Sequence, residues 1–146
     1  MNVENIAHFN ELQENAILLG LPREQYVFLK SPTDEEKLEL LRRAIAVLYT
    51  PSNEHFGIVP VEAMYMKCCV IAPNSGGPRE TIVNEETGFL VNENPDSFAE
   101  KMAELIKDKR KAEAMGSAGR KRVESVFAMD NFVLQLENLI REVFFI

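Results

Sequence analysis

Two hydrophobic patterns alternate along the chain. Apolar runs of four or five residues are typical of buried strands, and stretches with apolar residues every three or four positions are typical of amphipathic helices. The short runs predict strands over 26–30, 46–50, 69–73 and 88–91. The longer spacing predicts helices over 2–19, through Leu38, Leu41 and Ile45, over 59–67, from Pro95 through Ile106, and over 109–126 and 129–144.

Polar residues mark where two of these helices begin. Thr33 and Glu36 have the spacing of a capping box, in which the hydroxyl and the carboxylate each satisfy a free backbone N–H. Asn94 followed by Pro95 predicts an N-cap with proline at the first helical position, where its missing N–H costs nothing.

Strands that alternate with helices indicate βαβ units. We therefore expect a Rossmann-like α/β fold, with a parallel sheet and helices on both of its faces. The 146 residues suffice for one domain and are too few for two full-sized ones, so we treat 1–146 as one partial domain in which roughly 109–146 are C-terminal helices. Because the chain opens on a helix and not on a strand that feeds a phosphate loop, we expect at least one βα unit to be missing before it.

Charge and hydropathy narrow the classes of function. The formal net charge is −7, so the chain has no general attraction for nucleic acid or anionic lipid. No apolar run approaches the roughly 20 residues of a membrane span, and the first residues lack the basic and apolar blocks of a signal peptide. The clustered basic residues Arg110, Lys111, Arg120, Lys121 and Arg122 are interpreted as a solvated face, with contact to an anionic membrane as the alternative.

The two cysteines, Cys68 and Cys69, are neighbours. Adjacent cysteines cannot form a disulfide that cross-links distant parts of a domain, so a reducing compartment fits this chain. We expect both to enter a buried strand as small apolar residues. Nothing in the sequence supports a metal site, a redox pair or another cofactor.

Candidate chemistry follows the second predicted strand, over 51–64. Gly57 allows a positive φ or a close approach of backbone to ligand. The helix beyond it points the free N–H groups of Ile58 and Val59, and its positive dipole end, towards a phosphate. Glu54 lies before this helix and Glu62 inside it, so the two carboxylates reach different parts of a ligand, where they can accept from sugar and ribose hydroxyls. Alternatively, Gly57 is only a turn residue and Glu62 only a favourable charge near a helix N-terminus.

A second glycine-containing segment, 74–80, follows the third predicted strand. The carboxyl ends of parallel strands bound the ligand crevice of an open sheet, so both segments are expected near one site. Pro78 predicts a helix start directly after the glycines. No lysine follows them, which rules out a P-loop NTPase. The alternative to ligand contact is a plain strand-to-helix turn with Glu80 in its first turn.

These motifs resemble those of a known family. Glu54, Phe56, Gly57, Glu62 and Ala63 match the E-x7-E pattern of retaining glycosyltransferases with the GT-B fold (family 4), and the strings SGGPRE and TGFLV match its later motifs in order and spacing. Within that group the chain is similar to mannosyltransferases of the dolichol pathway. The resemblance covers essentially the whole chain, most closely over 46–91, and corresponds to the later part of the C-terminal, donor-binding half of a GT-B fold.

The resemblance implies roles for individual residues. Glu54 would act as the catalytic residue that touches the hydroxyls of the transferred sugar, and Glu62 would bind the ribose. Lys30 and Ser31 would hold the base, although the family's usual glycine is missing there. The donor sugar and diphosphate would contact Phe56, Gly57, Ile58, Val59, Ser75, Gly76 and Gly77. A lone histidine such as His55 is more often a surface or packing residue than a ligand contact.

The resemblance also implies an activity, with GDP-mannose as donor and a dolichol-linked oligosaccharide as acceptor at the cytosolic face of the endoplasmic reticulum. The acceptor would bind a missing N-terminal domain. Catalysis would be metal-independent, and the family's leaving-group cations have no counterpart here, since Arg79 and Lys67 could replace them only by coincidence. We therefore expect this chain alone to be inactive. The alternatives are a family member that uses a UDP-sugar and a non-catalytic α/β binding module.

Overall fold

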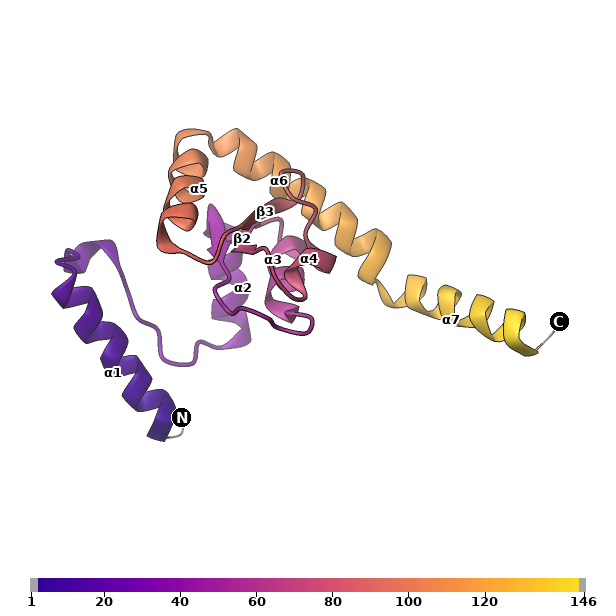
Figure 1. The fold of residues 1–146 in the computed structure, drawn as a ribbon, viewed down its shortest axis with the longest axis horizontal. Coiled ribbons are helices and arrows are strands. Elements are labelled where there is room, and N and C mark those ends of the chain that lie inside the picture. The colour runs from indigo at the N-terminus through magenta and orange to yellow at the C-terminus, as the bar shows by residue number, and fades with distance from the viewer. Residues whose placement is uncertain (1–2, 145–146) are drawn as a thin grey trace. The chain divides into compact units, whose positions relative to one another are not determined.

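The computed structural model describes the backbone of residues 3–144 and side chains from Ile6 onward. The chain divides into two compact units, one ending at Lys37 and one beginning at Leu38. Each unit is described by itself below. The element order is drawn in Figure 1.

The first unit is built on one long helix and a short aromatic cluster. Helix α1, Val3–Leu18, agrees with the helix predicted over 2–19, of which residue 2 lies outside the described residues. A single 3-10 turn, Arg23–Gln25, follows. The Phe28 ring then packs edge-on against Phe9, with 5.8 Å between ring centroids.

The strand predicted over 26–30 is wrong, because these residues have no regular secondary structure. A strand exists only where a neighbour shares its backbone hydrogen bonds, and within the described residues this segment has no strand partner. Its aromatic side chains pack with the first unit instead, and Phe28 also contacts Tyr26 at 5.3 Å between centroids. A hydrophobic pattern alone could not reveal that the partner is missing.

The second unit contains the sheet. Helix α2, Asp34–Arg43, runs across the boundary between the units. The elements that follow are β1 (Ala46–Leu48), α3 (Ile58–Tyr65), β2 (Cys69–Pro73), α4 (Pro78–Thr81), β3 (Gly88–Val91), α5 (Pro95–Lys107), α6 (Lys109–Arg122), a π-helical turn (Val123–Phe127) and α7 (Met129–Phe144). The predicted helix over 109–126 is thus α6 continued by the π-helical turn.

The three strands form one parallel sheet in the order β1-β2-β3. Val47 pairs with Val70 in the first ladder, and Ile71 pairs with Phe89 in the second. All five residues of β2 are buried, as expected for a central strand covered on both faces.

Two hydrophobic cores lie against the two faces of the sheet. Successive residues of β2 point to opposite faces. Val70 packs with Val61 and Met64 of α3, whereas Ile71 packs with Leu105 of α5 and with residues of α6. Helices therefore cover both faces, which confirms the predicted α/β fold class.

The predicted helix starts are confirmed by their hydrogen bonds. Glu36 accepts from the Thr33 N–H at 2.8 Å while the Thr33 hydroxyl accepts from the Glu36 N–H at 3.2 Å. The Asn94 side chain accepts from the Ser97 N–H at 2.9 Å, and Pro95 is the first residue of α5.

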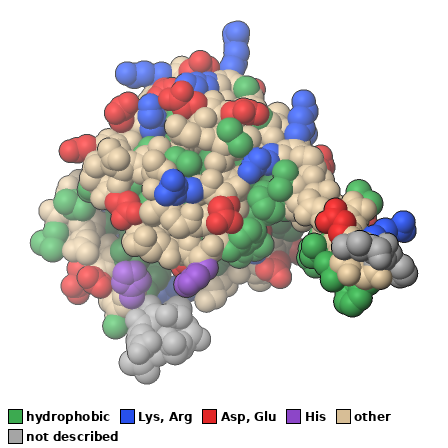
Figure 2. Space-filling model, turned by 45° about the vertical axis from the view of Figure 1, so that its right-hand side comes forward, with side chains coloured by type: hydrophobic (Ala, Val, Ile, Leu, Met, Phe, Trp, Pro, Cys, Tyr) green, Lys and Arg blue, Asp and Glu red, His purple; other side chains and the backbone are tan. Residues whose placement is uncertain are grey.

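Helix α7 exposes an apolar face. None of its described residues is buried, and hydrophobic side chains lie uncovered along the arm at the right of Figure 2. Among the described residues, no helix is both long enough and apolar enough to cross a bilayer.

Candidate functional site

The two segments singled out by their sequence meet directly. The Gly77 N–H donates to the Glu54 carbonyl at 2.6 Å. Beside it, the Asn53 N–H donates to the Ser75 hydroxyl at 3.4 Å. Because these segments follow the ends of β1 and β2, the parallel sheet delivers both to one edge.

Glycine is required where these backbones touch. A Cβ on Gly76 would lie 2.3 Å from the Glu54 carbonyl oxygen, and a Cβ on Gly77 would lie 2.2 Å from the Phe56 carbonyl oxygen. Gly76 also has a φ of +55°, a region that glycine adopts without steric cost. Gly77 has an ordinary helical φ of −57°, so only the close contact explains its identity.

The contact forms a cavity of about 530 Å³, lined by Asn53, Glu54, His55, Gly76, Arg79 and Glu80. Glu54 and Gly76 were among the predicted site residues. His55, interpreted from the sequence as a surface or packing residue, lines the cavity, and so does Arg79. Their signal in the sequence was their position inside the two motifs. The lining combines two carboxylates, a guanidinium and an imidazole, a set that can bind hydroxyls and an anion together.

The turn into α3 has the geometry expected of an anion site. Gly57 is the N-cap, with a φ of +73°. The N–H groups of Ile58 and Val59 lie in the first helical turn, where they have no acceptor inside the helix. Pro60, the third residue of α3, has no N–H, so Ile58 and Val59 supply the free amides of this turn. The exposed Ile58 and Val59 therefore offer two amides at the positive end of the helix dipole.

Tyr49 packs against this turn and has no counterpart among the residues predicted from the sequence. A Cβ on Gly57 would lie 3.0 Å from the Tyr49 hydroxyl oxygen, so the buried phenol contacts the turn directly. Burial, and to a lesser degree the Glu54 carboxylate, raise the pKa of Tyr49. One feature of the sequence indicated that Tyr49 could reach the site: it is an aromatic residue with a hydroxyl group, near the end of the strand predicted over 46–50.

The remaining predicted residues occupy three places. The Phe56 ring packs edge-on against Phe127 at 5.9 Å between centroids, so its side chain is used for packing. Glu62 is half-buried on α3 and does not line the 530 Å³ cavity. Lys30 and Ser31 belong to the first unit, where the Lys30 ammonium lies over the Phe9 ring at 4.4 Å. Since the strand expected to present Lys30 and Ser31 does not form, their role towards the base stays a prediction.

Two arginines of α6 hold the ends of the site helices. The Arg122 guanidinium donates to the carbonyls of Thr81 and Glu80, at 2.8 and 2.7 Å, at the end of α4. Arg120 donates to the Tyr65 carbonyl at the end of α3 and stacks on the Tyr65 ring.

The prediction of a solvated basic face is therefore wrong for Arg120 and Arg122, which are half-buried and bonded to backbone. Lys111 of the same predicted cluster pairs with Glu104 at 2.5 Å. The alternation of basic and helix-forming residues could not show that α6 packs against the ends of α3 and α4.

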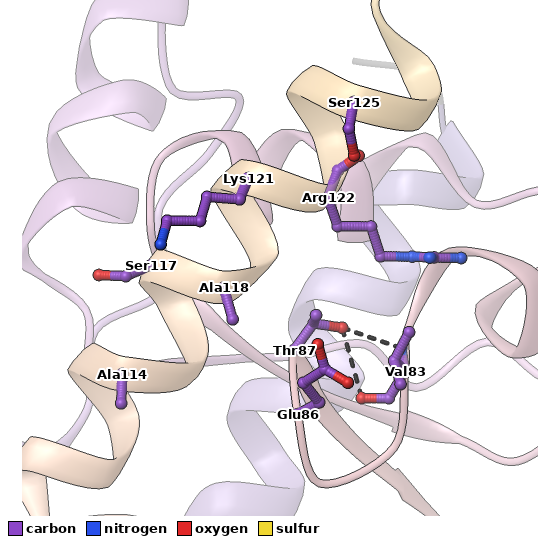
Figure 3. Close-up of a pocket in the computed structure, with 9 residues that line it drawn as sticks. All are labelled: Val83, Glu86, Thr87, Ala114, Ser117, Ala118, Lys121, Arg122 and Ser125. Atoms are coloured by element: carbon purple, nitrogen blue, oxygen red, sulfur yellow. Dashed lines mark hydrogen bonds between the residues drawn. The ribbon is translucent and has the colours of Figure 1, made fainter.

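A larger cavity, about 560 Å³, contains none of the predicted site residues. It lies between α6 and the loop that precedes β3. In Figure 3 the Lys121 side chain runs towards Ser117, whereas Arg122 extends away from them. Thr87 closes the loop by accepting from the Val83 N–H at 2.9 Å. This cavity shares no residue with the site beside Glu54.

The cysteines are buried in or next to β2. Burial raises the pKa of Cys68 to about 11 and that of Cys69 to about 12. The part of the chain that the structure describes holds no group of three or more His, Cys, Asp or Glu side chains that could bind a metal ion.

The sequence and the fold were compared with those of known proteins. Residues 5–122 match the family model of glycosyl transferases group 1. The mouse alpha-1,3/1,6-mannosyltransferase ALG2 is 48% identical over 133 residues, which are 91% of this chain and 32% of that protein. The chain thus spans about one third of the length of such relatives.

Several solved structures have similar folds, and the following two are among those that exceed 25% identity. Sucrose-phosphate synthase from Thermosynechococcus elongatus has a TM-score of 0.80 and 28% identity over 94% of this chain and 35% of that chain. A TarM variant from S. aureus, solved in complex with Fondaparinux, alpha-GlcNAc-glycerol and UDP, has a TM-score of 0.77 and 26% identity over 89% of this chain and 26% of that chain. Both agree with a GT-B half as the fold. By the family model, which matches most of its length, the chain belongs to the glycosyl transferases group 1.

Proposed function

We propose that this chain is the donor-binding part of a retaining mannosyltransferase. The complete protein would transfer mannose from GDP-mannose to a dolichol-linked oligosaccharide, in N-glycan precursor synthesis at the cytosolic face of the endoplasmic reticulum. The observation that carries the proposal is the bond from the Gly77 N–H to the Glu54 carbonyl, since it unites both motifs around one cavity. The 48% identity to a mouse protein named as an alpha-1,3/1,6-mannosyltransferase supports the choice of mannose.

The chemistry of transfer fits the groups at this site. The bond from the sugar C1 to the diphosphate oxygen breaks, C1 bonds to an acceptor hydroxyl oxygen, and the proton of that hydroxyl passes to the departing diphosphate. Positive charge grows on the sugar and negative charge on the leaving diphosphate. Fixed dipoles stabilise such a leaving group, and removing one donor typically costs about 10²–10³ in rate. We assign this part to the Ile58 and Val59 amides at the start of α3.

The carboxylates would bind hydroxyls. Glu54, in the cavity, would accept from hydroxyls of the transferred sugar, and Glu62, on α3, from those of the ribose. Phe56, Ser75, Gly76 and Gly77 would contribute backbone and hydroxyl groups near the sugar. Lys30 and Ser31 remain the proposed contacts to the base.

Calorimetry of this chain with GDP-mannose and with UDP-glucose tests the proposal. We expect GDP-mannose to bind more tightly, and Glu62→Gln to weaken it at least tenfold. Glu137→Gln, which makes the same charge change on the exposed face of α7, is the matched control and should bind like the unaltered chain. Tighter binding of UDP-glucose would replace the proposed donor by a UDP-sugar. Binding that Glu62→Gln leaves unchanged would refute the site.

A transfer assay tests the catalytic role in the longer protein that carries this sequence. Glu54→Gln should abolish mannose transfer while the protein still binds donor. We expect the 146-residue chain alone to show no transfer. Full activity of Glu54→Gln would exclude Glu54 as the catalytic residue.

A further inference from the structure

A third cavity, of about 220 Å³, lies at the opposite end of the strands from Glu54. Ala44 and Ile45, in its lining, come directly before β1, and Lys67 lies two residues before β2. The cavity beside Glu54 is lined instead by residues that follow these two strands. The two cavities share no residue, and this inference does not depend on the proposed function.

Cationic side chains dominate this cavity. Its lining includes Arg42, Arg43, Lys67 and Lys109, with Glu113 as its one carboxylate. They come from the end of α2, the turn between α3 and β2, and the start of α6. The formal net charge of the chain is −7, so a cluster of four cations differs in sign from the chain as a whole.

These cations lack partners that would explain why they gather. Among the described residues, Arg43, Lys67 and Lys109 form no ion pair, and Arg42 reaches only the exposed Glu39, at 3.9 Å. Like charges held close together repel each other. Arg42 and Arg43 lie in the last turn of α2, where the helix dipole favours cations. That reason does not extend to Lys109, which begins α6 at the positive end of its dipole, or to Lys67.

The backbone fixes the position of Lys67 within the cluster. Lys67 has a φ of +61°, and its N–H donates to the Met64 carbonyl at 2.9 Å. A Cβ on Gly116 would lie 1.9 Å from the Lys67 carbonyl oxygen, so α6 packs directly on this turn. The Cys68 thiol, 3.6 Å from the Ala44 carbonyl oxygen, ties the turn to the residues that lead into β1. The cations therefore project from a rigid frame and not from a loose loop.

We propose that this cavity binds a phosphate group. Arginine and lysine are the side chains that recognise phosphate oxygens, and four of them line this small cavity. The cavity is smaller than the roughly 300 Å³ at which pockets for whole small molecules begin, so it admits one anionic group and not an entire nucleotide. The phosphate comes from a soluble phosphate compound or from the headgroup of an acidic phospholipid.

Two probes distinguish these sources. The first is inorganic phosphate, titrated into the chain at constant ionic strength while backbone amide resonances are followed. The second is co-sedimentation with phosphatidylcholine vesicles that contain or lack phosphatidic acid. Shifts at Arg43, Lys67 and Lys109 with phosphate alone indicate a soluble source. Co-sedimentation that requires phosphatidic acid indicates a lipid headgroup.

A matched pair of double variants separates a site from general charge. Arg43→Gln with Lys109→Gln removes two cations from the cavity. Arg141→Gln with Lys121→Gln removes the same charges from exposed positions of α7 and α6. We expect the first pair to weaken binding of the effective probe at least tenfold and the second pair by less than twofold. Equal weakening by both pairs, or no response to either probe, would overturn the proposal.

Discussion

At the scale of single residues, the candidate site depends on two glycines that let two backbones touch. Gly77→Ala would place a methyl group 2.2 Å from the Phe56 carbonyl oxygen. We expect it to lower the free energy of unfolding by about 1–3 kcal/mol, the usual cost of overpacking, and to weaken GDP-mannose binding at least tenfold. Urea unfolding and calorimetry measure these two effects.

The control for this variant is Gly20→Ala. Gly20 has a φ of +68°, but a Cβ added there would meet no atom within 4 Å, so its substitution carries only a backbone cost. Donor binding should survive it. If Gly77→Ala bound GDP-mannose as tightly as Gly20→Ala does, the contact between the two loops would not matter for the site.

The buried thiols give a prediction about reactivity and pH. Because burial raises the pKa of Cys68 to about 11 and of Cys69 to about 12, both are protonated in the folded chain at roughly pH 8. We expect a thiol reagent such as DTNB to react with neither until the chain unfolds.

The same shifts give the sign of a pH effect on stability. The unfolded thiols ionise near pH 8.5–9, so the stability tied to their protonated form is complete below that pH. It is lost progressively as the pH rises through about 9 towards 12. A free energy of unfolding that stays flat from about pH 8 to pH 11, or fast labelling of the native chain, would contradict the burial of these thiols.

Residues of the site differed in how far the sequence could predict them. The positive φ of Gly57 and the helix start at Pro78 follow from local backbone chemistry, so they could be predicted. Tyr49, His55 and Arg79 reach the site through contacts between segments far apart in the chain. His55 and Arg79 stand inside the two motifs, but nothing local shows that their side chains line one cavity, and nothing local shows that Tyr49 packs on the turn at Gly57.

At the scale of elements, α6 positions the short helix α4 beside the cavity. Arg122→Gln would remove the two hydrogen bonds from its guanidinium to the Thr81 and Glu80 carbonyls. We expect the free energy of unfolding to fall by about 1–3 kcal/mol, as for bonds made by a charged donor. Lys121→Gln, an exposed neighbour on the same helix, should change it by less than about 0.5 kcal/mol. Equal stability of the two variants in urea unfolding would show that α4 needs no such support.

The sequence predicted the strands that have a partner in the sheet, but it could not show that one apolar segment lacks a partner. Strands β2 and β3 have the predicted bounds, because their short apolar runs lie in a parallel sheet that supplies both burial and partner strands. The segment 26–30 has the same apolar character but no partner strand among the described residues, so it stays irregular. The pattern reports burial, whereas a strand also needs a neighbour's hydrogen bonds.

At the scale of the whole molecule, the uncovered face of α7 should make the chain self-associate. Phe132, Leu136, Ile140 and Val143 are exposed at spacings of three and four, on one side of the helix. Contiguous apolar surface of this kind is buried when a partner is available. We expect sedimentation equilibrium to show association that increases with concentration.

A pair of variants tests the part played by this face. Phe132→Asp should return the chain to a monomer. Asn138→Asp, which adds the same charge on the polar side of α7, should not. A clean monomer at high concentration, or an equal effect of both variants, would reject this assignment.

The cavity beside Glu54 and the start of α3 together form the proposed binding site for a nucleotide-sugar, and the donor-binding and catalytic roles assigned above depend on it. An amide-resolved NMR titration of the chain with GDP-mannose, with UDP-glucose in parallel, tests it most directly. We predict shifts at residues 53–62 and 75–80, and at Lys30 and Ser31 where the base is proposed to bind, with GDP-mannose preferred. Shifts only around Arg43, Lys67 and Lys109, or none in a folded chain, would contradict it.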